Sequence, residues 1–154
     1  MDTTKRKVSA AKEASIESLD SKLKKSLIAA FASALDADRD ILKTANDKDL
    51  MEVTNISPAL KKRLTFDDTK IDELITGLNE LAKLEDPVGK TLLARQLDTN
   101  LNLYKVSCPI GVIGVIFESR PDALVQISSL CLKSGNSVIL KGGAEAKNTN
   151  EALF

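Results

Sequence analysis

The stretch IGVIGVIF, residues 110–117, decides the fold class. It is a nearly unbroken apolar run of strand length, and such a run is typical of a strand buried on both faces of a parallel sheet. Its two glycines, Gly111 and Gly114, lie inside the strand, and no third glycine opens the following helix. The run is therefore a strand and not a glycine-rich dinucleotide fingerprint.

A helix and a second strand follow this run. Pro121 and Asp122 begin the helix, Gly135-Asn136 can end it, and SVILK at residues 137–141 is the second strand. We expect the helix to turn four residues inward: Leu124, Ile127, Leu130 and Cys131. Strand, helix and strand within roughly 30 residues form a βαβ unit with a right-handed crossover. Asn148 or Thr149 is then expected to cap a further helix.

The part before residue 89 indicates amphipathic helices. Apolar residues recur at helical spacing from Leu23 to Leu35 after a Ser21 cap, and another helix starts near Asp38. Ser57-Pro58 is a helix-start signal. The clearest helix is predicted over residues 67–84, where five apolar residues repeat at three- and four-residue steps. They are Ile71, Leu74, Ile75, Leu78 and Leu81.

Between the helices and the βαβ unit the period changes to two. Leu101 and Leu103 alternate with asparagines, and Leu92 to Leu97 precede the polar break at residues 98–100. This alternation is typical of strands. The segment 89–108 is therefore predicted to be a hairpin or strand pair that projects from the body.

Composition excludes several partner classes. The chain has 22 Lys plus Arg and 22 Asp plus Glu, so no net field attracts nucleic acid or an anionic membrane. No apolar run approaches the roughly 20 residues of a membrane span. With no histidine and two cysteines we expect no metal site. Lys5, Arg6 and Lys7 hint at a mitochondrial presequence, but Glu13 interrupts the pattern, and we expect a cytoplasmic protein.

Three segments together resemble the gamma-glutamyl phosphate reductases of the aldehyde dehydrogenase superfamily. They are CPIGVIGVIFESRP at 108–121, LKSGNSVILKGG at 132–143, and the linker LEDPVGK at 84–90. The resemblance covers nearly the whole chain as the N-terminal portion of that family and is weakest over the first fifty residues. It implies an α/β fold with N-terminal helices, a hairpin, and the truncated start of a Rossmann-like parallel sheet.

The resemblance also implies an activity. Members reduce L-glutamyl 5-phosphate to L-glutamate 5-semialdehyde with NADPH and release phosphate, in proline biosynthesis. A thiolate forms a thioester that hydride then reduces. The family's nucleophilic cysteine is expected beyond Phe154. We therefore expect no catalytic residue within the chain and no turnover by the chain alone.

Residues 118–120 lie just beyond the carboxyl end of the first strand, where ligands bind in open α/β sheets. The guanidinium of Arg120 suits a carboxylate or phosphate of the substrate, and Ser119 can donate a hydrogen bond to an oxyanion or to the nicotinamide of the cofactor. The alternative is that Arg120 pairs with Glu118 or Asp122 and that Ser119 only precedes the helix.

The end of the second strand is the other half of the expected site. The resemblance implies that Lys141, Gly142 and Gly143 contact the adenosine ribose of NADPH or its phosphate. The alternative is a solvated lysine and a simple turn. In the wider superfamily a glutamate three residues after this lysine often shares the ribose contact. Here Ala144 holds that position and Glu145 comes one residue later, which leaves the role of Glu145 open.

Neither cysteine is expected to be the nucleophile, and both Cys108 and Cys131 are predicted to pack in the core. We divide the chain into a helical part at 1–88, a strand segment at 89–108 that resembles an oligomerisation element, and an incomplete dinucleotide-binding unit at 109–154. A second hypothesis is an inactive fragment or interaction module, in which the strand segment pairs with a full-length reductase or a second copy.

Overall fold

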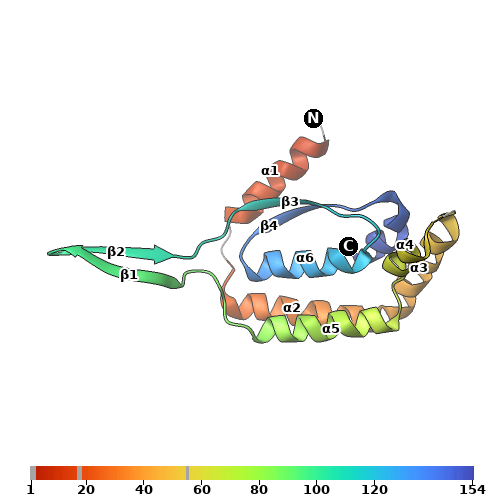
Figure 1. Ribbon diagram of the computed structural model, residues 1–154, viewed down its shortest axis with the longest axis horizontal. Helices are drawn as coiled ribbons and strands as arrows, with labels where there is room; N and C mark the ends of the chain where they lie inside the picture. Colours follow the sequence, from red (N-terminus) through yellow and green to blue (C-terminus); the bar gives the residue numbers. More distant parts are fainter. Residues whose placement is uncertain (1–2, 17–18, 55) are drawn as a thin grey trace.

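The computed structural model describes residues 3–16, 19–54 and 56–154. A small parallel sheet has helices on both of its faces, and a long hairpin extends away from this body (Figure 1). The α/β class predicted from the sequence is confirmed. No helix in the described ranges is long and apolar enough to span a membrane.

The N-terminal helices are α1 (Thr3–Ile16), α2 (Ser21–Ala37), α3 (Arg39–Glu52), α4 (Pro58–Leu64) and α5 (Asp68–Lys83). Three of these five helices, α2, α4 and α5, begin where a short polar side chain caps them. Ser57 accepts a hydrogen bond from the Leu60 amide (3.2 Å), as the sequence predicts. The predicted Ser21 cap is wrong by one residue, because the carboxylate of Asp20 accepts from the Leu23 amide at 2.7 Å and Ser21 is already the first residue of α2.

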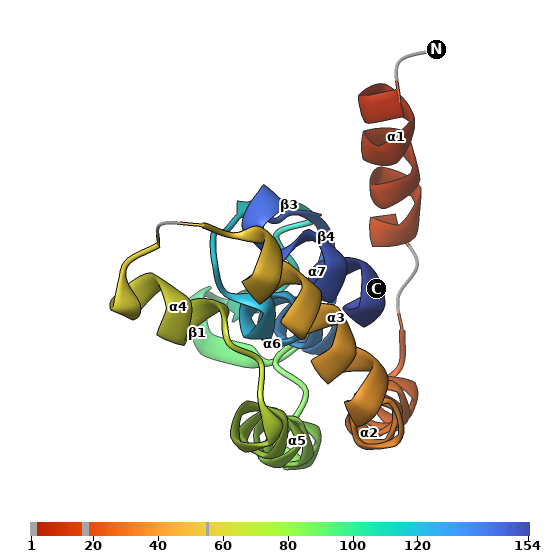
Figure 2. The ribbon, with the colours of Figure 1, turned by 90° about the vertical axis from the view of Figure 1, so that its right-hand side faces the viewer.

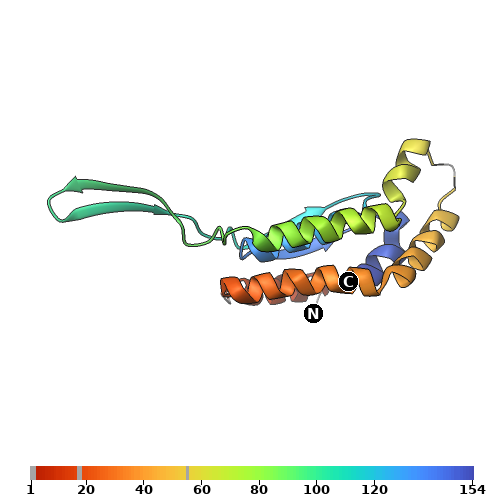
Figure 3. The ribbon, with the colours of Figure 1, turned by 90° about the horizontal axis from the view of Figure 1, so that it is seen from below.

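The core lies where α2 and α5 pack side by side beneath α6 (Figures 1 and 3). The apolar face of α5 is the predicted one, with Ile71, Leu74 and Leu78 buried. The face of α2 is rotated by about one position from the expected stripe. Ile28 is fully buried, whereas Leu23 is 43% exposed.

The predicted βαβ unit is confirmed. Strands β3 (Val112–Ile116) and β4 (Ser137–Lys141) are parallel, and α6 (Pro121–Lys133) connects them. Gly135, at φ +70°, takes the left-handed conformation that ends α6. On the side of the sheet away from α6, α1 contacts both strands, mainly β4 (Figure 2).

Two burial predictions for this unit are wrong. Residues 110–117 are not buried on both faces, since Ile110 and Ile116 are 84% and 77% exposed. Within the described residues the sheet has two strands, so each keeps an unpaired edge. Leu130 is 56% exposed because it lies in the groove between α6 and α5, while Val125 and Ser129 take buried positions.

The hairpin is also confirmed. Strands β1 (Thr91–Asp98) and β2 (Leu101–Val106) pair antiparallel around a two-residue turn in which Asn100 has φ +62°. The hairpin projects from one end of the body, and every residue of both strands is exposed (Figure 1). Cys108 follows the hairpin and is exposed, so its predicted core position is wrong.

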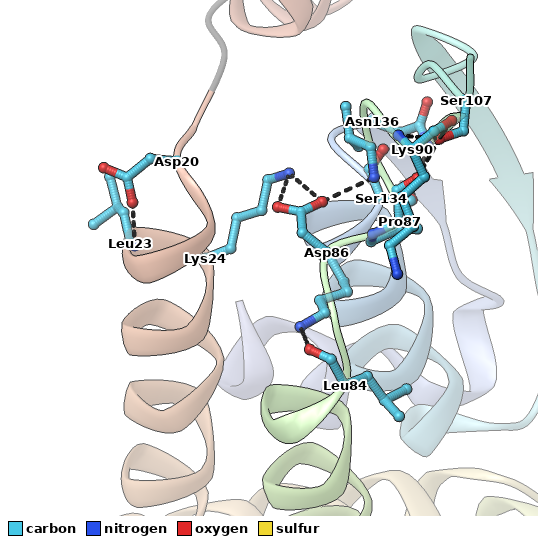
Figure 4. Close-up of polar contacts among 12 residues, drawn as sticks. Asp20, Leu23, Lys24, Leu84, Asp86, Pro87, Lys90, Ser107, Ser134 and Asn136 are labelled. Atoms are coloured by element: carbon cyan, nitrogen blue, oxygen red, sulfur yellow. Dashed lines mark hydrogen bonds and ion pairs between the residues drawn. The ribbon is translucent and has the colours of Figure 1, made fainter. Parts of the chain in front are cut away.

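The two segments at the base of the hairpin, residues 84–90 and 107–111, are called the neck here. Buried charged side chains hold the neck in place (Figure 4). Lys24, only 3% exposed, forms an ion pair with Asp86 at 2.9 Å. Asp86 also accepts from the Val88 amide (3.0 Å). Lys133, 4% exposed, donates to the Leu84 carbonyl at 2.6 Å. The neck is thus tied to α2 and α6 through side chains.

The C-terminal helix is capped from a distant part of the chain. After the 3-10 turn η1 (Ala144–Ala146), α7 (Lys147–Leu153) begins with no side-chain cap of its own. Neither Asn148 nor Thr149 caps it as predicted, because both lie inside the helix. Their amides instead donate to the carboxylate of Asp49 on α3, at 2.9 and 2.8 Å.

Candidate functional site

The residues singled out by sequence come together at one edge of the sheet. In the parallel register Ile116 lies opposite Lys141, and the Phe117 amide donates to the Lys141 carbonyl at 3.1 Å. Residues 118–120 and 141–143 therefore leave β3 and β4 side by side. We call these two segments the carboxyl edge, the place where parallel sheets bind ligands.

Ser119 is engaged at this edge by a carboxylate. It is 4% exposed and has φ +50°, in the left-handed region. Its amide and its hydroxyl both donate to Oε1 of Glu145, at 2.5 and 2.8 Å. The hydroxyl proton that the sequence analysis assigned to an oxyanion or a nicotinamide is thus used within the protein.

Glu145, whose role the sequence left open, is held in its charged form. Burial raises its pKa, but hydrogen bonds from its own amide and from Ser119, together with the positive charge of Lys141, lower it by more. The net pKa lies below the usual 4.5. At neutral pH Glu145 is a carboxylate that only accepts hydrogen bonds.

Arg120 forms an ion pair with Asp122, which was the alternative to ligand binding considered from the sequence. Its Nη2 lies 3.0 Å from Oδ2 of Asp122, yet 56% of the arginine side chain is exposed. Oδ1 of Asp122 is buried and has no hydrogen-bond partner among the described residues. The guanidinium therefore keeps donors free on its solvent side while Asp122 orients it.

Lys70 also belongs to this electrostatic environment, and sequence reasoning missed it. Burial lowers the pKa of Lys70, and the negative charge of Asp122 opposes that effect. Its ammonium donates to the Arg63 carbonyl at the end of α4 (2.8 Å). Lys70 stands in the first turn of α5, far from the carboxyl edge in sequence, so no local motif marks it.

Lys141 is exposed at the end of β4, and its ammonium donates weakly to the Gly142 carbonyl at 3.3 Å. Gly142 has a packing role, because a Cβ there would lie 2.4 Å from Nδ2 of Asn150. The carboxyl edge therefore presents two exposed cations, Arg120 and Lys141, beside a carboxylate already bound to Ser119. Such an edge suits an anionic, phosphate-bearing ligand.

The cysteines do not join this edge. Cys131 is buried in α6, as predicted, and burial raises the pKa of its thiol. Cys108 precedes β3 and so lies at the opposite end of that strand from Ser119. In the described part of the chain no group of three or more potential metal-ligating side chains comes together.

Comparison with known proteins gives a consistent result. No protein-family model matches the chain. Over 146 residues it is 58% identical to the gamma-glutamyl phosphate reductase of Pelotomaculum thermopropionicum, across 92% of this chain and 34% of that protein. The chain belongs to the gamma-glutamyl phosphate reductase family. The reductase of Methanosarcina mazei is 50% identical over 156 residues, covering 96% of this chain and 35% of its own length.

Solved structures of gamma-glutamyl phosphate reductases have the same fold. The crystal structure from Saccharomyces cerevisiae matches with a TM-score of 0.93 at 37% identity, over 99% of this chain and 40% of that one. The structure from Thermotoga maritima matches with a TM-score of 0.92 at 33% identity. The chain spans about a third of the length of the curated relatives it matches, and the expected N-terminal portion is confirmed.

Proposed function

We propose that this chain supplies the cofactor edge of an NADPH-dependent reductase that converts L-glutamyl 5-phosphate to L-glutamate 5-semialdehyde and phosphate in proline biosynthesis, in the cytoplasm. The supporting observation is the carboxyl edge itself, where Arg120 and Lys141 are exposed cations beside a sheet edge suited to ligands. Arg120 is proposed to bind the substrate, and Lys141 with Gly142 and Gly143 the cofactor.

NADPH fits the residues at this edge. When bound, it supplies the hydride that reduces a thioester to an aldehyde. The Lys141 ammonium can face a ribose phosphate, since among the described residues its hydrogen bond is a long one to the Gly142 carbonyl. The carboxylate of Glu145 accepts two hydrogen bonds from Ser119 and lies in the field of Lys141, so its negative charge is partly offset within the protein.

The thiolate nucleophile is proposed to lie outside residues 1–154. Cys131 is buried with a raised pKa, which disfavours the reactive thiolate. Cys108 is exposed but lies at the wrong end of β3. We therefore expect no semialdehyde formation by this chain alone, and turnover with NADPH and glutamyl phosphate would contradict this.

The cofactor proposal is tested by equilibrium binding of NADPH and NADH to the purified chain. Lys141→Ala should weaken NADPH about fivefold, as expected for roughly 1 kcal/mol from one charge-assisted contact, and should weaken NADH less. Lys147→Ala is the matched control, because this lysine lies on α7 with 69% of its side chain exposed. Equal losses for both variants, or no loss for Lys141→Ala, would reject the proposal.

The hairpin supports a second role, in assembly. Its strands are exposed along their whole length and carry seven large apolar or aromatic residues. They are Leu92, Leu93, Leu97, Leu101, Leu103, Tyr104 and Val106. An exposed apolar strand pair of this kind is an interaction surface, and strand addition at its edge is the simplest mode. We propose pairing with a second copy or with a full-length reductase.

Size-exclusion chromatography with light scattering tests this role. The chain should elute as an oligomer alone, or as a mixed complex with an intact family member. Leu93→Ser with Leu103→Ser should shift it to the monomer, since these residues lie in the paired strands. Ile41→Ser, which alters a 62% exposed residue of α3, should leave assembly unchanged. A monomeric parent that forms no mixed complex would end this proposal.

A further inference from the structure

A single carboxylate joins the two segments of the carboxyl edge. Ser119 lies in the turn between β3 and α6, and Glu145 lies in η1 after β4. Both donors of Ser119, the amide at 2.5 Å and the hydroxyl at 2.8 Å, converge on one oxygen of Glu145. We call this pair of hydrogen bonds the latch.

The latch coincides with a costly backbone conformation. Ser119 has φ +50°, a region that residues other than glycine, asparagine and aspartate rarely adopt. Such a conformation persists only where surrounding contacts impose it. The hydrogen bond that the Ser119 amide donates to Glu145 acts directly on the Ser119 backbone. Arg120, the next residue, leaves the turn in a direction that depends on this conformation.

Gly143 and Lys141, near the end of β4, accommodate the Glu145 carboxylate. A Cβ added at Gly143 would lie 2.2 Å from both carboxylate oxygens of Glu145, so the side chain occupies the space that glycine leaves free. Lys141 attracts the same carboxylate from the end of β4. Among the described residues, Ser119 and Lys141 thus act on the Glu145 carboxylate, one from each segment, together with the amide of Glu145 itself.

We infer that Glu145 is a positioning residue, whose carboxylate holds Ser119 in the left-handed conformation and thereby fixes Arg120 at the carboxyl edge. It acts through Ser119 and not by contact with a ligand. Gly143 is part of the same device, because any larger residue there would displace the carboxylate from Ser119. The effect on ligand binding rests on the proposed function, whereas the latch itself does not.

The latch is tested on the chain without ligand by NMR. The Ser119 amide proton shift should follow pH with an inflection below 4.5, where Glu145 titrates, and the inflection should be absent in Glu145→Gln. Amide exchange at Ser119 should rise roughly tenfold or more in Glu145→Ala, as expected when a hydrogen bond to a charged group is lost. Glu145→Gln should restore much of the protection, since its amide oxygen can accept both hydrogen bonds.

Two further variants sharpen the test. Gly143→Ala should raise Ser119 exchange as Glu145→Ala does, by displacing the carboxylate. Glu118→Gln, which removes an exposed charge one residue from Ser119, should change neither the exchange nor the inflection. Parent-like exchange in Glu145→Ala, or a parent Ser119 shift with no inflection, would overturn the inference.

Ligand affinity separates the latch from the proposed function. Because Arg120 is the proposed substrate residue, the probe is inorganic phosphate. If the parent binds phosphate, Glu145→Ala should weaken that binding severalfold and Glu145→Gln should recover it, and unchanged phosphate affinity in Glu145→Ala would overturn the positioning of Arg120. If the folded parent binds neither phosphate nor NADPH, the proposed ligand role of this chain fails. The pH inflection and the exchange rates then still decide whether Glu145 holds Ser119.

Discussion

Asp49 shows how much of this structure depends on a single side chain. It is 2% exposed, and its two oxygens accept from the amides of Asn148 and Thr149 and from the Thr149 hydroxyl (2.6 Å). Asn46, one turn earlier, donates to the same hydroxyl at 3.1 Å and accepts from the Phe66 amide at 2.8 Å. This network is fully paired, so removal of one member leaves several buried groups without partners.

We predict that Asp49→Ala lowers the free energy of unfolding by about 3 kcal/mol, because buried donors on α7 then lose a charged acceptor. Urea denaturation measures the change. Asp47→Ala, which alters an exposed aspartate on the same helix, should change it by less than about 0.5 kcal/mol. A similar small effect for both variants would mean that the network contributes little to stability.

Residue-level roles were the hardest to obtain from sequence. The carboxyl edge could be placed, because a strand-length apolar run and the short strand after it fix where parallel strands end. The contact of Glu145 with Ser119 could not be predicted, since the two residues are 26 positions apart and no spacing rule connects them. Cys108 was misplaced for a related reason, because its exposure depends on where the hairpin leaves the body.

At the scale of elements, local chemistry was a good guide. The start of α4 at Ser57-Pro58, the extent of α5 and the hairpin turn all follow from neighbouring residues. The cap of α7 failed because it comes from α3, about 100 residues earlier. Prediction therefore found the elements whose ends are stabilised locally, with the cap of α2 misplaced by one residue, and missed the cap that another helix supplies to α7.

The neck of the hairpin yields a prediction on pH. Burial raises the pKa of Asp86, but Lys24, the Val88 amide and Lys133 lower it by more, to a value below the usual 3.8. A carboxylate with a depressed folded-state pKa stabilises the fold above its unfolded pKa, and this stability is lost as pH falls through the folded value. Asp86 should therefore contribute fully at pH 7 and progressively less below about pH 4.

Urea midpoints at pH 7 and pH 3 for the parent and Asp86→Asn check this. The variant should be less stable at pH 7 and should lose less stability on acidification than the parent does. Glu80→Gln, an exposed carboxylate on α5, should keep the parent's dependence on pH. If Asp86→Asn and the parent respond to acid alike, the ion pair with Lys24 does not control the neck.

At the scale of the whole molecule, the strands of the hairpin contribute no residue to the buried core of the body. The buried cluster draws on α2, α3, α5 and α6, and all residues of β1 and β2 are exposed. The neck closes on itself below the strands, where the Ser107 amide donates to the Lys90 carbonyl at 2.9 Å and the Ser107 hydroxyl donates to Pro87. The body therefore gains little stability from the strands.

We predict that replacing residues 91–106 with a short glycine turn leaves the unfolding free energy of the body within about 1 kcal/mol, since loop length has a weak effect on stability. Chemical denaturation of a dilute sample provides the measurement. The same deletion should abolish any oligomer. A large loss of stability at concentrations where the parent is monomeric would show that the hairpin supports the core.

The cap that Asp49 gives to α7 also bears on the order of folding. With seven residues, α7 is shorter than the roughly 12 to 15 that an isolated helix needs in water. Its first amides find their acceptor only after a loop of about 100 residues has closed. In refolding followed by pulsed amide exchange, α7 should therefore acquire protection after α5, which is long, locally capped and independent of that closure.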